Sequence, residues 1–181
     1  MLLAVAERTI AERGIGGLSL RGLAADARTT TRAVYSLFGS KEALLGDLGA
    51  RAFKLLREGL EALPQTADPQ HDLVEAALMF RRFALEHPAL FSIGIQRTDP
   101  SVWPRFREAA TDALEALHAH IDPLARAGRL GGRTVPEAAF QFHALCEGLA
   151  AVELRGMPSS TDRERYWRSA FDALISGFAS S

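Results

Sequence analysis

The stretch Ser19–Lys41 reads SLRGLAADARTTTRAVYSLFGSK and decides how the first part of the chain folds. Apolar residues follow the spacing of one helix face over 20–27 and again over 34–38, with a polar break at 28–30 between them. These apolar positions are Leu20, Leu23, Ala24, Ala27, Val34 and Phe38. Two short helices joined by a tight turn predict a helix-turn-helix motif at about 19–38, whose second helix would enter the major groove of DNA.

The first turn of that second helix carries the residues best suited to reading bases. Thr30 is placed to cap the helix, which leaves Thr31 and Arg32 in its first turn. Arginine can bond guanine O6 and N7 together, and threonine can donate, accept or touch a thymine methyl group. We therefore expect Thr31 and Arg32 to read the DNA sequence.

Other polar residues of the stretch suit the phosphate backbone, whose contacts position a protein without specifying sequence. Arg21 and Arg28 supply positive charge near the two ends of the first helix. Helix N-termini offer free amide groups to phosphate, which can recruit Ser19, Ser40 and Lys41. Ser40 is also placed to cap a third helix that opens on Lys41.

A longer series of residues continues this pattern into the third helix: Leu23-Ala24, Ala27, Thr30, Val34-Tyr35, Phe38, Lys41-Glu42 and Leu44. The order resembles the N-terminal domain of TetR-type bacterial transcriptional regulators, and Tyr35-x-x-Phe38 followed by Lys41 is its most specific part. The resemblance is close over roughly the first 45 residues and rests on helix order and length beyond them. It implies that Tyr35 and Lys41 hold phosphates. The candidate DNA contacts are then Ser19, Arg21, Arg28, Thr30, Thr31, Arg32, Tyr35, Ser40 and Lys41.

One position in the turn departs from the family pattern. The family commonly has glycine where this chain has Arg28. Glycine adopts a positive φ easily, whereas arginine in that conformation costs on the order of 1 kcal/mol. Either the turn differs here, or Arg28 accepts that cost and contacts a phosphate.

Composition and charge are consistent with a small basic DNA-binding head attached to a larger acidic body. The chain has 181 residues, of which 48% are hydrophobic and 24% charged, and its formal net charge is −1. Residues 1–57 carry a net charge of +4, whereas residues 58–181 carry −5. A basic region at one end is expected of a DNA-reading module attached to something else.

Several classes of site and location are disfavoured. Cys146 is the single cysteine, which excludes an internal disulfide and favours a reducing cytoplasm. The apolar run at 1–6 is too short for a signal peptide or a membrane span, so we expect no membrane partner. His118 and His120 are a poor metal pair because residues two apart on a helix do not face each other. We expect no metal and no cofactor.

Periodicity and capping signals predict an all-α protein of about nine helices, with nothing that alternates like a strand. Asp68-Pro69 and Asp99-Pro100 are each expected to open a helix, and Pro123 to end or kink the second of these. Capping boxes at Thr134-x-x-Glu137 and Thr161-x-x-Glu164 predict the last two helices at about 136–155 and 162–179.

The predicted organisation is a DNA-binding head followed by a larger helical body. We expect the three-helix head, with its helix-turn-helix, at 1–45. A linker helix at 41–63 joins it to the body, at 46–181, which is expected to bind an effector and to dimerise.

The middle of the body is rich in aromatic residues. Apolar walls with a few polar groups are typical of a small-molecule pocket, and they are equally typical of an ordinary helical core. The resemblance to TetR-type regulators places an effector pocket among these helices, with a small apolar or aromatic molecule as the expected ligand. The candidate lining residues are Phe80, Phe83, Phe91, Trp103, Phe106, His118, Phe140 and His143.

The last two helices resemble the pair through which members of that family form homodimers. Their candidate interface residues are Phe171, Leu174, Ile175 and Phe178. Two-fold symmetry of the dimer would match its two heads to a palindromic operator in double-stranded DNA.

The sequence therefore predicts a non-enzymatic, dimeric transcriptional regulator, a repressor that a small molecule releases from its operator. One alternative is a protein of the same fold that binds a small molecule but has weak or lost DNA binding, because of Arg28 in the turn. A remote alternative is a helical hydrolase that uses Cys146, with His143 on the same helix face. No third residue that would orient such a pair is evident.

Overall fold

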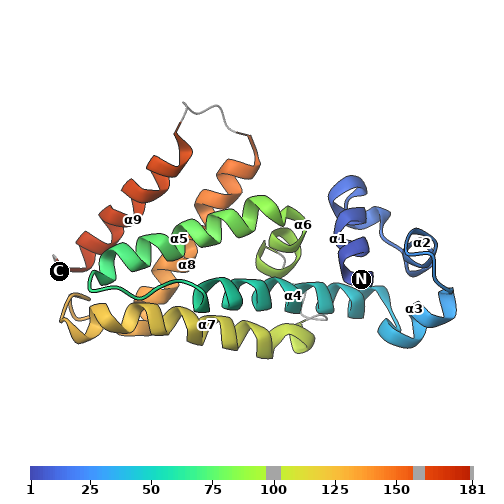
Figure 1. Ribbon diagram of the computed structural model, residues 1–181, viewed down its shortest axis with the longest axis horizontal. Coiled ribbons are helices and arrows are strands. Elements are labelled where there is room, and N and C mark those ends of the chain that lie inside the picture. Colours follow the sequence, from blue (N-terminus) through green and yellow to red (C-terminus); the bar gives the residue numbers. More distant parts are fainter. Residues whose placement is uncertain (97–102, 157–161, 180–181) are drawn as a thin grey trace. The chain divides into compact units, whose positions relative to one another are not determined.

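The computed structural model describes residues 1–96, 103–156 and 162–179, and its regular elements there are all helical (Figure 1). The first elements are α1 (Leu2–Arg13), the 3₁₀ turn η1 (Ile15–Gly17), α2 (Leu20–Asp26) and α3 (Thr31–Phe38). Next come α4 (Lys41–Glu61), α5 (Pro69–Glu86), α6 (Pro88–Leu90) and the π-helical η2 (Phe91–Gln96). The last are α7 (Trp103–Arg126), α8 (Val135–Leu154) and α9 (Arg163–Ala179). The all-α fold is confirmed. Within the described residues, no helix is long and apolar enough to cross a membrane.

Most helix starts agree with the predicted caps. The Asp68 carboxylate accepts hydrogen bonds from the backbone N–H groups of Gln70 and His71, both at 3.1 Å, at the start of α5. Thr134 and Glu137 form the complete capping box of α8.

The structure corrects the sequence-based boundaries at two helix ends. α7 continues through Pro123 to Arg126, so the expectation that this proline ends the helix is wrong. Pro123 cannot donate to the carbonyl of Ala119, but Ala119 is exposed and water can satisfy that carbonyl. The cap of α9 is Asp162, whose Oδ1 accepts from the Arg165 N–H at 3.0 Å, one residue later than predicted. Thr161 and the predicted start at Asp99-Pro100 lie outside the described residues.

The chain forms two compact units. Unit 1 contains residues 1–54 and 87–110, and unit 2 contains residues 55–86 and 111–181. The division expected after residue 45 concerns function and stays a prediction, whereas packing groups residues 41–54 of α4 with the head.

Unit 1 buries apolar side chains from α1, α2, α3 and α4. Leu23 of α2, Val34 of α3 and Leu44 of α4 are buried to 1% exposure or less. With seven and eight residues, α2 and α3 depend on this packing and on their caps, because isolated helices below about 12–15 residues are marginal in water.

Two close contacts connect α1 and η2 to the rest of unit 1. The Glu7 carboxylate of α1 accepts from Nδ1 of His87 at 2.7 Å and lies 3.6 Å from Nε of Arg51 in α4. η2 packs tightly on α4, since a Cβ added at Gly94 would lie 2.8 Å from the Cβ of Ala52. Only glycine fits that position without a shift of the helix.

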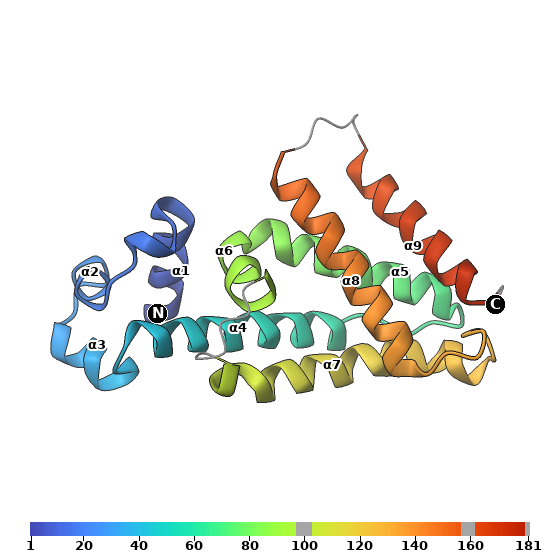
Figure 2. The same cartoon turned by 180° about the vertical axis from the view of Figure 1, so that it is seen from behind.

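Unit 2 brings α5, α8 and α9 together, side by side in both views (Figures 1 and 2). The carboxylate of Glu153 in α8 joins all three helices. It accepts two hydrogen bonds from the Arg81 guanidinium of α5, at 2.7 and 3.0 Å, and one from the Trp167 indole of α9, at 3.0 Å. Its side chain is only 6% exposed, so these partners replace the water that the carboxylate loses.

The environment of Glu153 makes this junction sensitive to acid. Burial alone would raise the pKa of Glu153, but the hydrogen bonds and charge of Arg81, the Trp167 indole and Arg163 outweigh it and lower the pKa. A carboxyl group with a lowered pKa stabilises the fold above its unfolded-state pKa of about 4.3. That stabilisation is lost as the pH falls through the folded-state pKa.

We predict that Glu153→Gln lowers the free energy of unfolding by about 2–3 kcal/mol at pH 7, because Arg81 would keep its charge in a largely covered site without a partner. Urea unfolding of both proteins measures this difference, and the difference should shrink below about pH 4. The control is Glu164→Gln, whose pair with Arg168 is half exposed and should change stability by less than about 1 kcal/mol. Equal effects of the two substitutions would contradict the assignment.

Candidate nucleic-acid interface

The first turn of α3 exposes polar side chains to solvent, while the apolar side chains of the same helix are buried. Thr30 caps the helix, since its Oγ1 accepts from the Ala33 N–H at 3.1 Å, as predicted. Thr31 and Arg32 are exposed in the first turn, while Val34 and Phe38 face the core. Tyr35, one turn further, is 48% exposed. The candidate base-reading residues are therefore available to a groove of DNA.

The turn between α2 and α3 contains the departure from the family pattern. Arg28 has φ of 52°, and it is the one residue other than glycine with a positive φ in the described part of the chain. The Thr29 N–H donates to the Ala24 carbonyl at 2.9 Å, and the Arg28 N–H to the Ala25 carbonyl at 3.1 Å. These two bonds form a Schellman motif, in which Arg28 occupies the left-handed position.

The C-terminus of α7 shows the same motif with the usual residue. There, Gly128 has φ of 68°, and the bonds from Arg129 to Leu124 and from Gly128 to Ala125 measure 2.9 and 3.0 Å. The chain thus uses glycine at one such turn and accepts the strained arginine at the other. The first of the two possibilities for Arg28, a different turn, does not hold.

Lys41 has a structural contact that the sequence did not indicate. Its Nζ donates to the carbonyl of Ile15 at 2.7 Å, which connects the start of α4 to the segment between α1 and α2. An ammonium group has three protons, so this bond leaves donors for a phosphate. Lys41 is half-buried, and its substitution would affect the fold as well as any DNA contact.

The remaining candidate DNA contacts lie at helix starts or in exposed positions of the same region. The Oγ atoms of Ser19 and Ser40 cap α2 and α4, accepting from the N–H groups of Gly22 and Ala43 at 3.0 and 3.1 Å. Arg21 and Arg28 are exposed. The structure thus brings the nine candidates together on α2, its turn, α3 and the start of α4.

The aromatic candidates for an effector pocket separate into several groups. Phe80 and Phe83 of α5 are buried in unit 2, where the Phe80 ring lies 5.8 Å from His143, edge to face. Phe91 and Phe106 are buried in unit 1. His118 is half-buried on α7, and the side chain of Trp103 lies outside the described part.

Phe140 is 75% exposed on α8, unlike the buried aromatic candidates, and its role in an effector pocket stays a prediction. It sits on an exposed apolar stripe. Phe140, Ala144, Gly148 and Val152 recur every fourth residue, and all four are exposed.

The predicted dimer-interface residues of α9 also need correction. Phe171, Ile175 and Phe178 are 0–1% exposed within this chain, so they cannot present a face to a second chain. Phe171 packs on Phe142 of α8, with ring centroids 4.8 Å apart. Leu174 is partly exposed and keeps its predicted role as a candidate. The apolar period identified the buried face of α9, but that face packs on its own chain.

Cys146 is completely buried in α8. Burial raises the pKa of its thiol well above the ordinary value, which suppresses the thiolate that a nucleophile requires. The structure therefore gives the hydrolase alternative no support. Among the described residues, no group of three or more His, Cys, Asp or Glu side chains could hold a metal ion.

Family models match most of the chain. Residues 2–48 match the model described as "Bacterial regulatory proteins, tetR family", and residues 73–174 match "Tetracyclin repressor-like, C-terminal domain". The chain belongs to the TetR family. It is a DNA-binding transcriptional regulator, and the regulators of this family are not enzymes. No curated protein gave a significant sequence match.

Solved structures match nearly the whole chain. A protein of unknown function from Rhodococcus sp. RHA1 is 26% identical with a TM-score of 0.87, and covers 98% of this chain and 93% of its own. The TetR-family regulator PfmR from Thermus thermophilus is 21% identical with a TM-score of 0.72, covering 96% of each chain. FadR from Bacillus subtilis, solved in complex with stearoyl-CoA, is 15% identical with a TM-score of 0.79, covering 97% of each. The last two likenesses show the fold alone.

We predict that Arg28→Gly raises the free energy of unfolding by up to about 1 kcal/mol, because glycine removes the left-handed strain. If Arg28 contacts a phosphate, the same substitution weakens DNA binding while it stabilises the fold. Urea unfolding and DNA titration of one preparation test both effects. Gly128→Arg is the reverse control and should destabilise by a similar amount. Loss of stability in Arg28→Gly would contradict the assigned strain.

Proposed function

We propose that this TetR-family protein is a repressor that binds a palindromic operator as a homodimer and leaves it when a small molecule binds the body. The observation that carries the proposal is the exposure of the first turn of α3. Thr31 and Arg32 are exposed to solvent there, while the apolar side of the same helix is buried. Release requires only that the ligand prefer a conformation whose heads no longer match the operator half-sites.

The proposed division of roles follows from exposure and chemistry. Thr31 and Arg32 read base edges from the N-terminal turn of α3. Tyr35 and Lys41 hold phosphates, as the family pattern implies, and Arg21 and Arg28 add positive charge beside them. Ser19, Thr30 and Ser40 already use their hydroxyl oxygens as caps, so their contribution to DNA is the backbone amides of the helix starts that they order.

We predict that Arg32→Ala weakens binding to the operator by about 1–3 kcal/mol and leaves binding to random DNA nearly unchanged. Lys41→Ala should weaken both alike and make the salt dependence shallower. Fluorescence anisotropy with the DNA upstream of the gene and a random duplex of equal length measures this, at two salt concentrations.

The matched control for Lys41→Ala is its urea unfolding, because Lys41 also bonds the Ile15 carbonyl. Equal losses of Arg32→Ala on both duplexes would refute base reading by Arg32. Failure of the unmodified protein to prefer its upstream DNA would favour the alternative, a ligand-binding protein of this fold with weak DNA binding.

The homodimer is supported by the chemistry of α8. One side of this helix is buried in unit 2, while the other exposes Phe140, Ala144, Gly148 and Val152. Exposed apolar residues along one side of a helix whose other side is already buried form a surface suited to a partner. Small residues between Phe140 and Val152 allow a second helix to approach closely. We place the dimer interface on this stripe and on the exposed face of α9 that carries Tyr166.

We predict that Phe140→Glu converts the dimer to monomer, because a charge at the centre of an apolar interface loses its hydration. Light scattering coupled to gel filtration measures the mass. The matched control is Leu114→Glu on α7, where the leucine is 45% exposed and outside the proposed interface. A Phe140→Glu protein that stays dimeric, with native helix content, would remove the stripe from the interface.

The proposed effector is a small apolar or aromatic molecule held in the body. The Phe80, Phe83 and His143 cluster supports this, because burial lowers the pKa of His143 and favours its uncharged form, despite the opposing charge of Glu147. The FadR structure with stearoyl-CoA is an example of a protein of this fold in complex with a fatty acyl thioester.

A further inference from the structure

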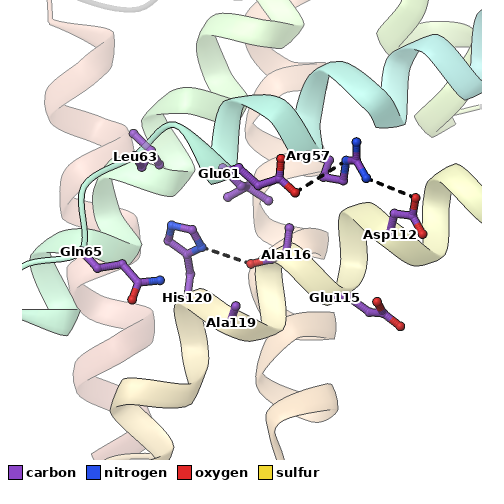
Figure 3. A pocket seen from close by; sticks show the side chains of 10 residues that line it. Arg57, Glu61, Leu63, Gln65, Asp112, Glu115, Ala116, Ala119 and His120 are labelled. Carbon is purple, nitrogen blue, oxygen red and sulfur yellow. Dashed lines mark hydrogen bonds and ion pairs between the residues drawn. The ribbon is translucent and has the colours of Figure 1, made fainter.

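A separate hollow of about 370 Å³ lies in unit 2, between the C-terminal turns of α4 and the middle of α7 (Figure 3). That size is at the lower end of the range for small-molecule sites, about 300–1,000 Å³. Leu60, Leu63 and Ala119 supply apolar surface, and polar side chains from both helices surround them. None of the candidate effector-pocket residues belongs to this lining.

His120 is the buried histidine of the lining, with 5% of its surface exposed. Its Nδ1 lies 3.1 Å from the carbonyl oxygen of Ala116, one turn earlier on α7. A carbonyl can only accept, so Nδ1 carries the proton, and Nε2 of the neutral ring is an acceptor. Nε2 is buried and meets no donor among the described residues. An acceptor left in this way favours a ligand that brings an N–H or O–H group.

The charges of the lining residues determine which sign of charge is favoured on the ligand. The lining contains three carboxylates, Glu61, Asp112 and Glu115, and one arginine, Arg57. Arg57 already lies 3.7 Å from Glu61 and 3.5 Å from Asp112 (Figure 3). Glu115 makes no ion pair with any residue in the described part of the chain. The lining therefore carries two more negative than positive charges, which favours a cation and disfavours an anion.

We propose that this hollow is a binding site for a small amine, a primary ammonium group carried on a short apolar body. The ammonium donates a hydrogen bond to Nε2 of His120 and lies in the negative potential of Glu115 and its neighbours. The apolar body covers Leu60, Leu63 and Ala119. The site differs in ligand charge and in residues from the apolar effector pocket, and it does not depend on DNA binding.

Calorimetric titration of the whole protein with hexylamine, in the absence of DNA, tests the site. The matched probes are 1-hexanol, which keeps the donor but lacks the charge, and hexanoate, which reverses the charge. We expect hexylamine to bind about tenfold more tightly than hexanol, and hexanoate not to bind. Equal binding of hexylamine and hexanol, or no binding of hexylamine, would overturn the proposal.

Two variants locate the binding. His120→Leu removes the acceptor and should weaken the binding of hexylamine by about tenfold, whereas His71→Leu on α5, outside the hollow, should not. Glu115→Gln removes the unpaired carboxylate and should weaken the binding of hexylamine by about threefold. Asp122→Asn makes the same charge change on α7 outside the hollow and should have no effect. Because Glu115 is exposed, its variant keeps the test decisive even if His120→Leu fails to fold. Unchanged affinity in Glu115→Gln would overturn the proposal.

Discussion

The shortness of α2 and α3 is the constraint on which the DNA-binding part depends. Helices of seven and eight residues have too few internal hydrogen bonds to persist alone. Their starts are therefore capped by Ser19 and Thr30, and their apolar sides are covered by the core. The polar sides of α2 and α3 are available to DNA because the apolar sides are buried and the N–H groups at the helix starts are already hydrogen-bonded. The exposed residues of α3 that are proposed to read bases can therefore change without loss of the fold, provided that the caps and the core stay.

The body depends on a different kind of support. Its helices are longer, and α5, α8 and α9 are capped as well, but they must also be held in one arrangement while one side of α8 stays exposed. The Glu153 carboxylate does this with directed bonds to α5 and α9, where apolar packing alone would permit sliding. A buried charge thus fixes the arrangement of α5, α8 and α9, and apolar surface is exposed on α8 where a second chain is proposed to bind.

Features that depend on a few neighbouring residues were predictable from the sequence. The caps Thr30 and Ser40 and the capping box at Thr134 are all local, and a positive φ at Arg28 was one of the two possibilities that the turn left open. The dimer face was not predictable, because the period of α9 identifies an apolar side without saying which helix covers it. The exposure of Phe140 was not predictable for a similar reason, since the sequence does not say which side of α8 other helices cover. The sequence pattern indicates only that His120 is a poor metal ligand. The lack of a hydrogen-bond partner for its Nε2 depends on tertiary packing, which places Leu63 and Gln65 in the same lining.

The strained turn at Arg28 has a consequence for how this protein can evolve. Every arginine codon is a single base change from a glycine codon, so relief of the strain is always one mutation away. If Arg28 touches a phosphate, that mutation exchanges affinity for the operator for a more stable fold. Populations under heat or other folding stress therefore have a direct mutational route to weaker DNA binding, with no change in the side chains that are proposed to read bases.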